Sequence, residues 1–299
     1  MRTRRHQQSR RRVWISGASG ESVDNAVTLF EQWRGSPVHI AGTWADATAD
    51  DQLNLWKFGS GQSYESWPWS LDLAIGAIYK TNGESWSAAA NGLYDARWSA
   101  SLQNARSGWM ARPRGTLYVR FSHEWNGDWF PWSVSSDEIS DFVIAWQKFY
   151  QLQRAIFPEA KLVFCTNANT SGQDYDWRTA WPGDEYVDIY STDYYSNHWM
   201  FNSDFDIHGA PSQLDTHRQF AADHHVPFAI SEWGNDTNFG DQPNYIESID
   251  LFCRRYGGTN AGELMYEVLF NVNSLDNNRF SIYPVTKAPL SSEVYRKRF

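Results

Sequence analysis

Short apolar runs alternate along this chain with longer amphipathic stretches, and this alternation constrains the fold more than any other feature. The apolar runs have the length and composition of β-strands, and the amphipathic stretches have the period of helices. Strand followed by helix, repeated, predicts βα units and a parallel sheet. We expect strands at residues 13–16, 37–43, 70–78, 116–122, 161–165, 187–192, 227–231 and 264–270. We expect helices near residues 22–33, 50–58, 95–111, 136–157, 211–224 and 244–256.

Eight strands with helices between them, in one chain without a linker, predict a closed (β/α)8 barrel, the TIM barrel. The 299 residues fit one such domain, since a barrel typically takes about 250 residues. We therefore expect a single domain over residues 13–299. A doubly wound open sheet is the alternative fold, but the chain lacks the glycine-rich phosphate fingerprint usual in that fold.

The first twelve residues form a basic arm with six arginines and no acidic residue. We expect residues 1–12 to be disordered, and a nucleic-acid tail is the less favoured alternative. The arm resembles the n-region of a signal peptide, but no apolar h-region follows it. Without the arm, 20 basic and 35 acidic residues remain, a net charge near −15. That charge argues against nucleic-acid or acidic-lipid partners and is compatible with a neutral polysaccharide.

Several other classes of protein are disfavoured by what the sequence lacks. No stretch approaches the roughly 20 apolar residues of a membrane span, so we expect no membrane partner, and a monomer. Cys165 lies in an apolar, strand-like run and Cys253 in a helical one, which predicts two buried thiols rather than a disulfide. The pair His224 and His225 has no partner at ligand spacing, so we expect no metal and no cofactor. The absence of a Gly-x-Ser-x-Gly motif argues against a serine hydrolase.

Tryptophan is unusually abundant, with 17 residues, and aromatic residues make up 16% of the chain. A large aromatic core is one explanation. Several tryptophans lie instead in stretches rich in glycine, asparagine, serine and proline. An exposed indole there can stack on the apolar face of a sugar while its N–H donates a hydrogen bond. We expect some of these to line a groove: Trp67, Trp69, Trp129, Trp132, Trp181 and Trp199.

Two glutamates follow apolar strands and are the strongest candidates for catalysis. Glu124 ends the fourth expected strand and Glu232 ends the seventh. In a barrel, the carboxyl ends of the strands carry the active site. Cleavage of a glycosidic bond needs two such carboxyls, one protonated to donate to the leaving oxygen and one ionised to attack the anomeric carbon. Arg120, on the inward face of the fourth strand, supplies a positive charge that can orient carboxylates.

Three segments resemble glycoside hydrolase family 26, in clan A. Residues 120–132 read Arg-Phe-Ser-His-Glu-Trp-Asn-Gly-Asp-Trp-Phe-Pro-Trp and look like the acid/base motif of that family. Residues 181–189, continuing to Asp193-Tyr194-Tyr195, are similar to its sixth-strand region. Residues 226–234, Val-Pro-Phe-Ala-Ile-Ser-Glu-Trp-Gly, look like its nucleophile strand.

The resemblance implies a retaining hydrolase with Glu124 as acid/base and Glu232 as nucleophile. It implies His123 as a sugar contact and Tyr195 as a phenol that donates to the nucleophile. With these we predict as substrate-binding residues Arg120, Trp129, Trp132, Trp181, Trp199 and Trp233. In a retaining enzyme we expect the two carboxyls to lie ~5–5.5 Å apart.

The resemblance also implies a substrate, for which we expect endo-cleavage of β-1,4-mannan. The fifth strand ends Phe164-Cys165-Thr166-Asn167 and the eighth Leu269-Phe270-Asn271, without the tryptophans expected of the family. Xylan, glucan, or a bacterial capsule or cell-wall glycan is therefore an alternative substrate. A carbohydrate-binding barrel without activity is a third possibility. A polysaccharide substrate implies an extracellular protein.

Overall fold

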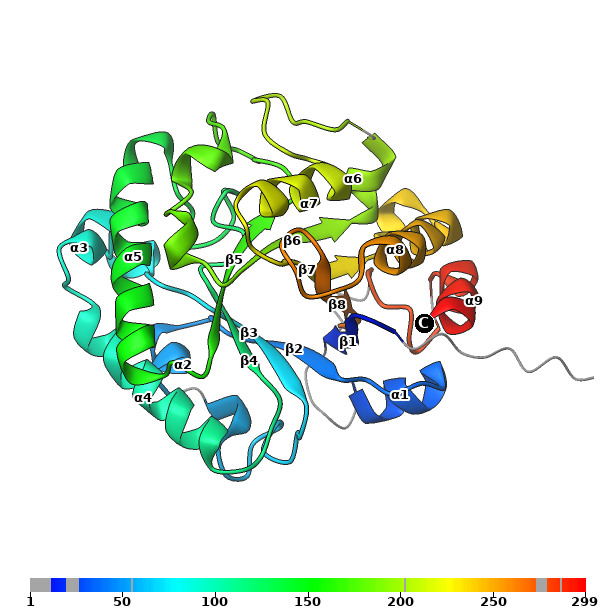
Figure 1. Cartoon of the computed structure of the whole chain (residues 1–299), viewed down its shortest axis with the longest axis horizontal. Coiled ribbons are helices and arrows are strands. Elements are labelled where there is room, and N and C mark those ends of the chain that lie inside the picture. The colour runs from blue at the N-terminus through cyan, green and yellow to red at the C-terminus, as the bar shows by residue number, and fades with distance from the viewer. Residues whose placement is uncertain (1–11, 20–26, 55, 202, 273–278, 286) are drawn as a thin grey trace, which may run out of the picture.

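The structure is a computed structural model that describes residues 12–19, 27–54, 56–201, 203–272, 279–285 and 287–299. Eight parallel strands form a closed barrel, in which each strand pairs with the next and β8 pairs with β1 (Figure 1). The strands are β1 (Ile15–Ser19), β2 (Ile40–Ala45), β3 (Ser70–Ile75), β4 (Leu117–Phe121), β5 (Lys161–Asn167), β6 (Ile189–Tyr195), β7 (Phe228–Gly234) and β8 (Leu264–Phe270). The predicted (β/α)8 barrel is confirmed, and the open-sheet alternative is excluded.

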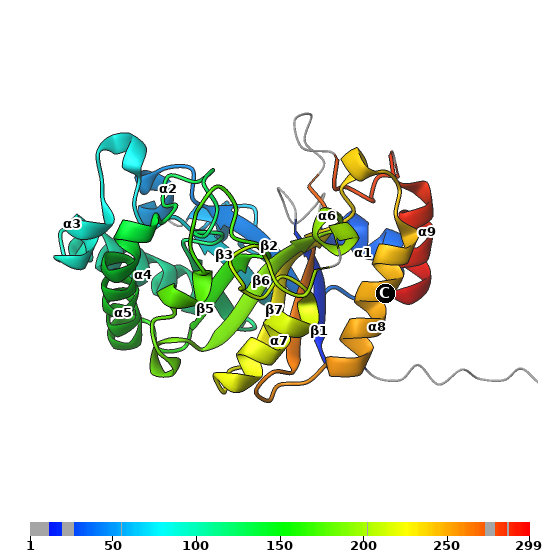
Figure 2. The same cartoon turned by 90° about the horizontal axis from the view of Figure 1, so that it is seen from above.

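Helices surround the barrel, with α4 and α5 packed together on one side and α8 and α9 together on the other (Figures 1 and 2). The helices are α1 (Leu29–Arg34), α2 (Ala49–Asn54), α3 (Trp86–Ala90), α4 (Asp95–Met110), α5 (Ile139–Ile156), α6 (Ser196–Phe201), α7 (Leu214–Asp223), α8 (Pro243–Tyr256) and α9 (Pro289–Arg298). Short 3₁₀ turns occur at Trp56–Phe58, Lys80–Asn82, Ser136–Glu138, Trp177–Ala180, Asp184–Tyr186 and Thr237–Phe239. Within the described residues, no helix is long and apolar enough to cross a membrane.

The helices pack on the barrel through aromatic side chains. Phe121 on β4 stacks on Phe149 of α5, with ring centroids 3.9 Å apart, and meets the edge of Trp98 of α4 at 5.2 Å. All three rings are buried. Each large apolar side chain buried in this way contributes about 1.5–3 kcal/mol. Much of the aromatic excess is therefore core, as the first of the two explanations expects.

Successive side chains along each strand point alternately toward the surrounding helices and into the barrel, so the outer core and the barrel interior are separate. Leu117, Val119 and Phe121 face the helices, while Tyr118 faces inward together with Arg120, the residue predicted on that face. The apolar part of the interior consists of Ile40, Tyr118, Val163, Ile189, Ala229, Tyr266 and Val268. Nearer the carboxyl ends of the strands the interior becomes polar and leads into the candidate site.

Two irregularities at the strand ends aim side chains into the opening of the barrel. The register between β6 and β7 shifts after Thr192, so Glu232 stands opposite Asp193. Because of this bulge, Ser231 and Glu232, although consecutive, both reach inner partners. After β4, Ser122 and Glu124 adopt positive φ angles of 58° and 50°. Such strained backbone costs on the order of 1–3 kcal/mol per residue and is typical of functional sites.

The expected elements differ from the observed ones mainly at their ends. The first strand begins at Ile15 rather than residue 13, and the strand expected at 70–78 ends at Ile75. Helix α1 overlaps only the second half of the helix expected at 22–33, and residues 20–26 lie outside the described residues. Residues 1–11 of the basic arm lie outside them as well. Helices α3, α6 and α9 were not predicted, because they are short or follow the last strand.

Candidate active site

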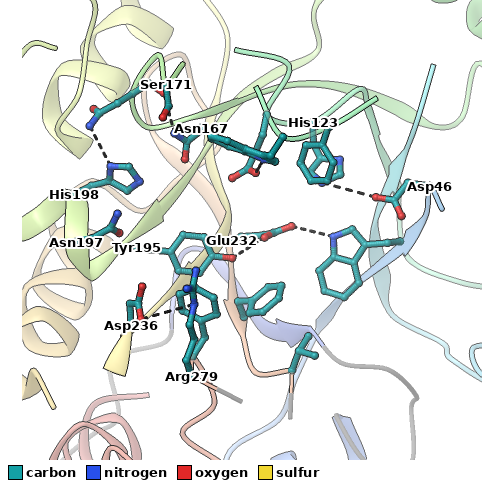
Figure 3. Close-up of a pocket in the computed structure, with 18 of the residues that line it drawn as sticks. Asp46, His123, Asn167, Ser171, Tyr195, Asn197, His198, Glu232, Asp236 and Arg279 are labelled. Atoms are coloured by element: carbon teal, nitrogen blue, oxygen red, sulfur yellow. Dashed lines mark hydrogen bonds and ion pairs between the residues drawn. The ribbon is translucent and has the colours of Figure 1, made fainter. Parts of the chain in front are cut away.

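A cavity of about 880 Å³ opens at the carboxyl ends of the strands (Figure 3). Strand-end residues and the loops that follow them line it: Trp44, Asp46, His123, Glu124, Trp129, Phe130, Asn167, Asn169, Thr170, Ser171, Tyr195, Asn197, His198, Glu232, Asp236, Phe270, Val272, Arg279 and Phe280. Both predicted catalytic glutamates are among them. The cavity combines carboxyls, amides and aromatic rings, which is the chemistry of a carbohydrate site.

Glu232 accepts hydrogen bonds from three donors on three other strands. The guanidinium of Arg120 donates to Oε1 at 2.9 Å, and the indole N–H of Trp44 donates to the same oxygen at 3.0 Å. The hydroxyl of Tyr195 donates to Oε2 at 2.7 Å. Hydrogen bonds from a cation and two neutral donors stabilise the ionised form of a carboxylate and fix its orientation. This environment suits a carboxylate that must attack as an anion.

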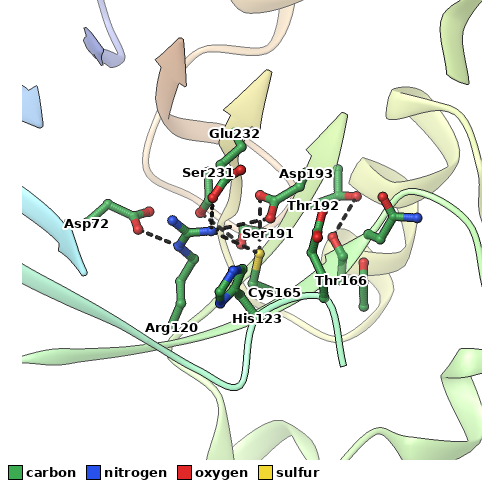
Figure 4. A network of polar contacts seen from close by, with 12 residues as sticks. Asp72, Arg120, His123, Cys165, Thr166, Ser191, Thr192, Asp193, Ser231 and Glu232 are labelled. Carbon is green, nitrogen blue, oxygen red and sulfur yellow. Dashed lines mark hydrogen bonds and ion pairs between the residues drawn. The ribbon is translucent and has the colours of Figure 1, made fainter. Parts of the chain in front are cut away.

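Below Glu232, Arg120 is fully buried among carboxylates (Figure 4). Its Nε donates to Asp72 at 2.5 Å, and its Nη1 lies 3.3 Å from Asp193. Burial alone would lower the pKa of Arg120, but Asp72, Glu232 and Asp193 raise it well above its usual value, so the residue is a fixed cation. Burial and the charge of Glu232 raise the pKa of Asp193 well above its usual range. Of the carboxyls around Arg120, Asp72 at 2.5 Å and Glu232 at 2.9 Å are closer to the guanidinium than Asp193.

Glu124 has the opposite environment. Burial and the nearby charge of Glu232 raise its pKa to about 8, although the indole N–H of Trp129, 2.9 Å from Oε2, favours the charged form. Its backbone N–H donates to the carbonyl of Cys165 on β5 at 3.1 Å, which anchors the strained loop. At neutral pH this carboxyl is protonated and can donate a proton. A protonated carboxyl beside a carboxyl that accepts three hydrogen bonds is the pattern of an acid and a nucleophile.

His123 lies beside the acid, between aromatic rings and an acidic side chain. Its ring packs against Phe130 and Trp132, with centroids 4.6 and 5.4 Å away. Its Nε2 lies 3.9 Å from the carboxylate of Asp46. Burial and the charge of Arg120 lower the pKa of His123 well below its usual value, so the imidazole is neutral. Burial raises the pKa of Asp46 to about 7.

The structure brings together six of the ten predicted site residues: Glu124, Glu232, His123, Tyr195, Arg120 and Trp129. Trp129 is the predicted tryptophan that lines the cavity, and its side chain is 45% exposed. Its ring lies over Gly127, where a Cβ atom would come within 2.4 Å of the indole. The glycine is therefore required for this placement of the ring.

The prediction is wrong for the tryptophans that the fold uses as core. Trp132 is buried and donates to the carbonyl of His123 at 2.8 Å, and Trp233 is buried and donates to Glu267 at 2.6 Å. Neither ring can reach a sugar. Trp181 packs against Phe164 and Phe220, Trp199 packs against Tyr245, and neither lines the cavity.

Trp67 and Trp69, also expected on the groove, do not line the cavity either. Trp67 is buried. Trp69 is 46% exposed but lies just before β3, at the opposite end of the barrel from the cavity. Of the six tryptophans expected on the groove, Trp129 therefore lines the cavity and the other five do not.

Several site residues were not predicted, among them Trp44, Asp46, Asp72 and His198. Trp44 shares the inward face of β2 with Ile40 and Gly42, but the expected strand ended at residue 43. Asp46 is an isolated acid after that strand, and Asp72 lies within an apolar run. The alternation of inward and outward side chains along a strand could have placed Trp44 and Asp72 inside the barrel. It does so only when one residue of each strand is already known to face inward. The expectation of two buried thiols is confirmed, since Cys165 and Cys253 are both buried and free.

Comparison with known proteins gives consistent results. A curated endoglucanase H of Acetivibrio thermocellus is 32% identical over 85 residues, which make up 27% of this chain and 9% of that protein. A β-mannanase of family 26 from Bacteroides ovatus has the same fold, with a TM-score of 0.65 and 14% identity over 96% of this chain and 88% of that one. A modular endo-β-1,4-mannanase from Cellulomonas fimi gives a TM-score of 0.62 and 14% identity, covering 96% and 71%.

At such identities the solved structures show a shared fold alone. The family model of glycosyl hydrolase family 26 matches residues 16–211, a span that includes most of β1, all of β2 to β6, Glu124 and Tyr195. The match covers more than half of the chain, and the fold of the barrel agrees with it. The protein therefore belongs to glycosyl hydrolase family 26.

Proposed function

We propose that this glycoside hydrolase cleaves β-1,4-mannan internally, with retention of configuration, using Glu124 as acid/base and Glu232 as nucleophile. The observation that carries the proposal is the contrast between two carboxyls in one cavity. Glu232 is held by Arg120, Tyr195 and Trp44, whereas the pKa of Glu124 is raised to about 8. A binding module would need neither a fixed anion nor a protonated carboxyl.

In the first step Glu124 donates its proton to the glycosidic oxygen while a carboxylate oxygen of Glu232 attacks the anomeric carbon. The leaving sugar departs as an alcohol, and a covalent glycosyl-enzyme forms. In the second step Glu124, now ionised, takes a proton from water, and the water oxygen displaces Glu232. Two inversions restore the starting configuration. The mechanism requires carboxyls ~5–5.5 Å apart, a distance that remains a prediction.

The cavity supports a neutral polysaccharide as substrate. Trp129, Phe130 and Phe270 provide rings, and Asn167 and Asn169 provide amides that suit sugar hydroxyls. Mannan is the first choice because the solved structures with this fold include β-mannanases. Phe270 at the end of β8 and Asn167 at the end of β5, where we expected tryptophan, favour a second candidate, another β-linked glycan. Because such polymers are too large to enter cells intact, we place the reaction outside the cell.

Azide rescue tests the two roles. Glu232→Ala should abolish turnover of every glycoside, and azide should restore cleavage of an aryl glycoside with an α-azide product. Glu124→Ala should lose roughly 10²–10⁴-fold in rate on polysaccharide, whose leaving group needs the proton. On an activated aryl glycoside the same variant should accumulate the glycosyl-enzyme, and azide should release it as a β-azide.

The matched control is Glu185→Ala, which removes an exposed carboxylate outside the cavity and should keep wild-type rates. Exchanged anomers would reverse the two roles. Wild-type activity in either active-site variant would remove that residue from the mechanism. A panel of mannan, xylan, glucan and bacterial glycans, with the products identified, decides the substrate.

A further inference from the structure

His198 lies on the short helix α6, at the end of the cavity away from Asp46 (Figure 3). Its ring stacks on that of Tyr194, with 6.1 Å between the centroids and 29° between the planes. Its backbone carbonyl accepts a hydrogen bond from Nε2 of Gln213 at 3.0 Å. The oxygen of that same amide accepts from the hydroxyl of Tyr194. The backbone of His198 is therefore tied to Gln213, and its ring lies against Tyr194.

A chain of hydrogen bonds assigns the proton on this imidazole. The hydroxyl of Ser212 donates to Oδ1 of Asn169, which turns the amide nitrogen of Asn169 toward His198. That nitrogen lies 3.2 Å from Nδ1 of the ring. An amide N–H can only donate, so Nδ1 accepts and the ring proton lies on Nε2.

Nε2 is left to donate into the cavity. Among the residues that the structure describes, no hydrogen bond is made to this atom. Burial lowers the pKa of His198 to about 4, so the ring is neutral where glycoside hydrolysis takes place. The result is an oriented, uncharged N–H donor in the wall of the cavity, which is suited to a sugar oxygen.

The position of His198 indicates which sugar it meets. Glu124, which must stand over the leaving oxygen, is anchored to β5 through the carbonyl of Cys165. The loop after β5 carries Asn169, and α6 follows β6, so this end of the cavity lies on the β5–β6 side of the acid. Trp44 and Asp46, at the other end, belong to β2 and the loop after it. A sugar leaving across Glu124 would therefore lie against His198.

We propose that the Nε2–H of His198 binds an oxygen of the leaving-group sugar and thereby determines specificity for chains over simple glycosides. The inference rests on the function proposed above and deepens it. A neutral donor held by Asn169 and Tyr194 loses little freedom when it binds. One well-formed hydrogen bond of this kind corresponds to about tenfold in rate.

Two substitutions separate this donor from the structure around it. His198→Asn keeps an oxygen that can accept from Asn169 but has no group where Nε2 stood. His198→Gln is long enough to place an amide N–H at the position of Nε2. We expect His198→Asn to lose about tenfold in kcat/KM on the polysaccharide, and His198→Gln to retain most of the rate. On an aryl glycoside, whose leaving group is not a sugar, the asparagine variant should lose less than about twofold. The control His224→Asn, on a surface histidine paired with Asp184, should change neither rate.

A measurement that needs no substrate completes the test. A nitrogen NMR spectrum of the 15N-labelled wild-type protein records the ring nitrogens of each histidine. The signals that are absent from the spectrum of His198→Asn belong to His198, and they should show the Nε2–H tautomer. The Nδ1–H tautomer would overturn the inference whatever the kinetics. Equal losses on both substrates would overturn the leaving-group assignment. A wild-type protein that cleaves neither substrate would refute the proposed function, and the tautomer would still decide whether His198 is a donor.

Discussion

Trp129 contacts both the cavity and the carboxyl of Glu124. Its N–H donates to the ionised form of that carboxyl, so removing it should favour the protonated form. The proposed mechanism requires a protonated Glu124, so kcat/KM of the wild type should fall as pH rises through about 8. In Trp129→Phe this basic limb should move to higher pH, and KM should rise because the phenyl ring is smaller.

Measurement of kcat/KM from pH 5 to 10 checks this expectation. The control is Trp69→Phe, an exposed tryptophan outside the cavity, which should leave the limb where it is. A limb that moves to lower pH in Trp129→Phe would show that the indole does not stabilise the charged carboxyl.

For single residues, the sequence predicted the place of Glu124, Glu232 and Tyr195 in the cavity better than the place of the tryptophans. Glu124, Glu232 and Tyr195 were identified because they belong to short motifs at strand ends. Trp132 and Trp233 belong to the same motifs, but they are buried. A loop sequence shows that a tryptophan is present but not where its side chain points. The orientation of the indole depends on packing partners, such as Glu267 for Trp233, that lie far away along the chain.

The presence and order of the eight strands were predicted correctly, because each strand carries a buried apolar run. Their ends were less well predicted, because strands in this barrel continue past the apolar run into polar residues that line the cavity. Strands β5, β6 and β7 extend beyond the expected ends to Asn167, Tyr195 and Gly234. The bulge that aims Glu232 inward depends on pairing between two strands, and no local pattern reveals it.

Glu267 on β8 provides a stability prediction for one element. It is buried and accepts from Trp233, and burial raises its pKa from an ordinary 4.5 to about 7. Because the folded state holds this proton more tightly than the unfolded state, the stabilisation is complete below pH 4.5 and is lost as pH rises through 7. By linkage the loss is about 3 kcal/mol.

Glu267→Gln removes this dependence, because an amide does not titrate. Relative to the wild type, the variant should therefore gain free energy of unfolding between pH 5 and pH 8. Urea denaturation at both values measures the gain, with Glu185→Gln, at an exposed position, as the control. A constant difference between wild type and Glu267→Gln would mean that the carboxyl is not protonated in the folded state.

For the whole molecule, the alternation of strands and helices was sufficient to predict a closed barrel and the edge on which chemistry takes place. This alternation did not predict the shape of the cavity. That shape depends on the loops after the strands, which have no periodic sequence pattern. Asp46 and Arg279, which are far apart in the sequence, line the same cavity. The family resemblance filled part of this gap, because two of the segments that carry it bring Glu124 and Glu232 into the cavity.

The three donors that hold Glu232 come from strands β2, β4 and β6, and Arg120 is fixed in turn by Asp72. None of these strands depends on Glu232 for its place. In Glu232→Gly the donors should therefore enclose a small site for an anion, next to an intact acid/base. An α-glycosyl fluoride could lose its fluoride into that site while Glu124 takes the proton of an acceptor sugar.

The new β-linkage would then persist, because the variant has no nucleophile to cleave it, and a degrading enzyme would become a glycosynthase. Fluoride release and chain growth from a glycosyl fluoride and an aryl glycoside acceptor measure this activity. The reference is Glu232→Gly combined with Glu124→Ala, which lacks the base. Equal rates in the two variants would show that the donors do not form an anion site that works with Glu124. On the proposed mechanism, the donors that hold the nucleophile for cleavage should, with the Glu232 side chain removed, support the synthesis of the same linkage.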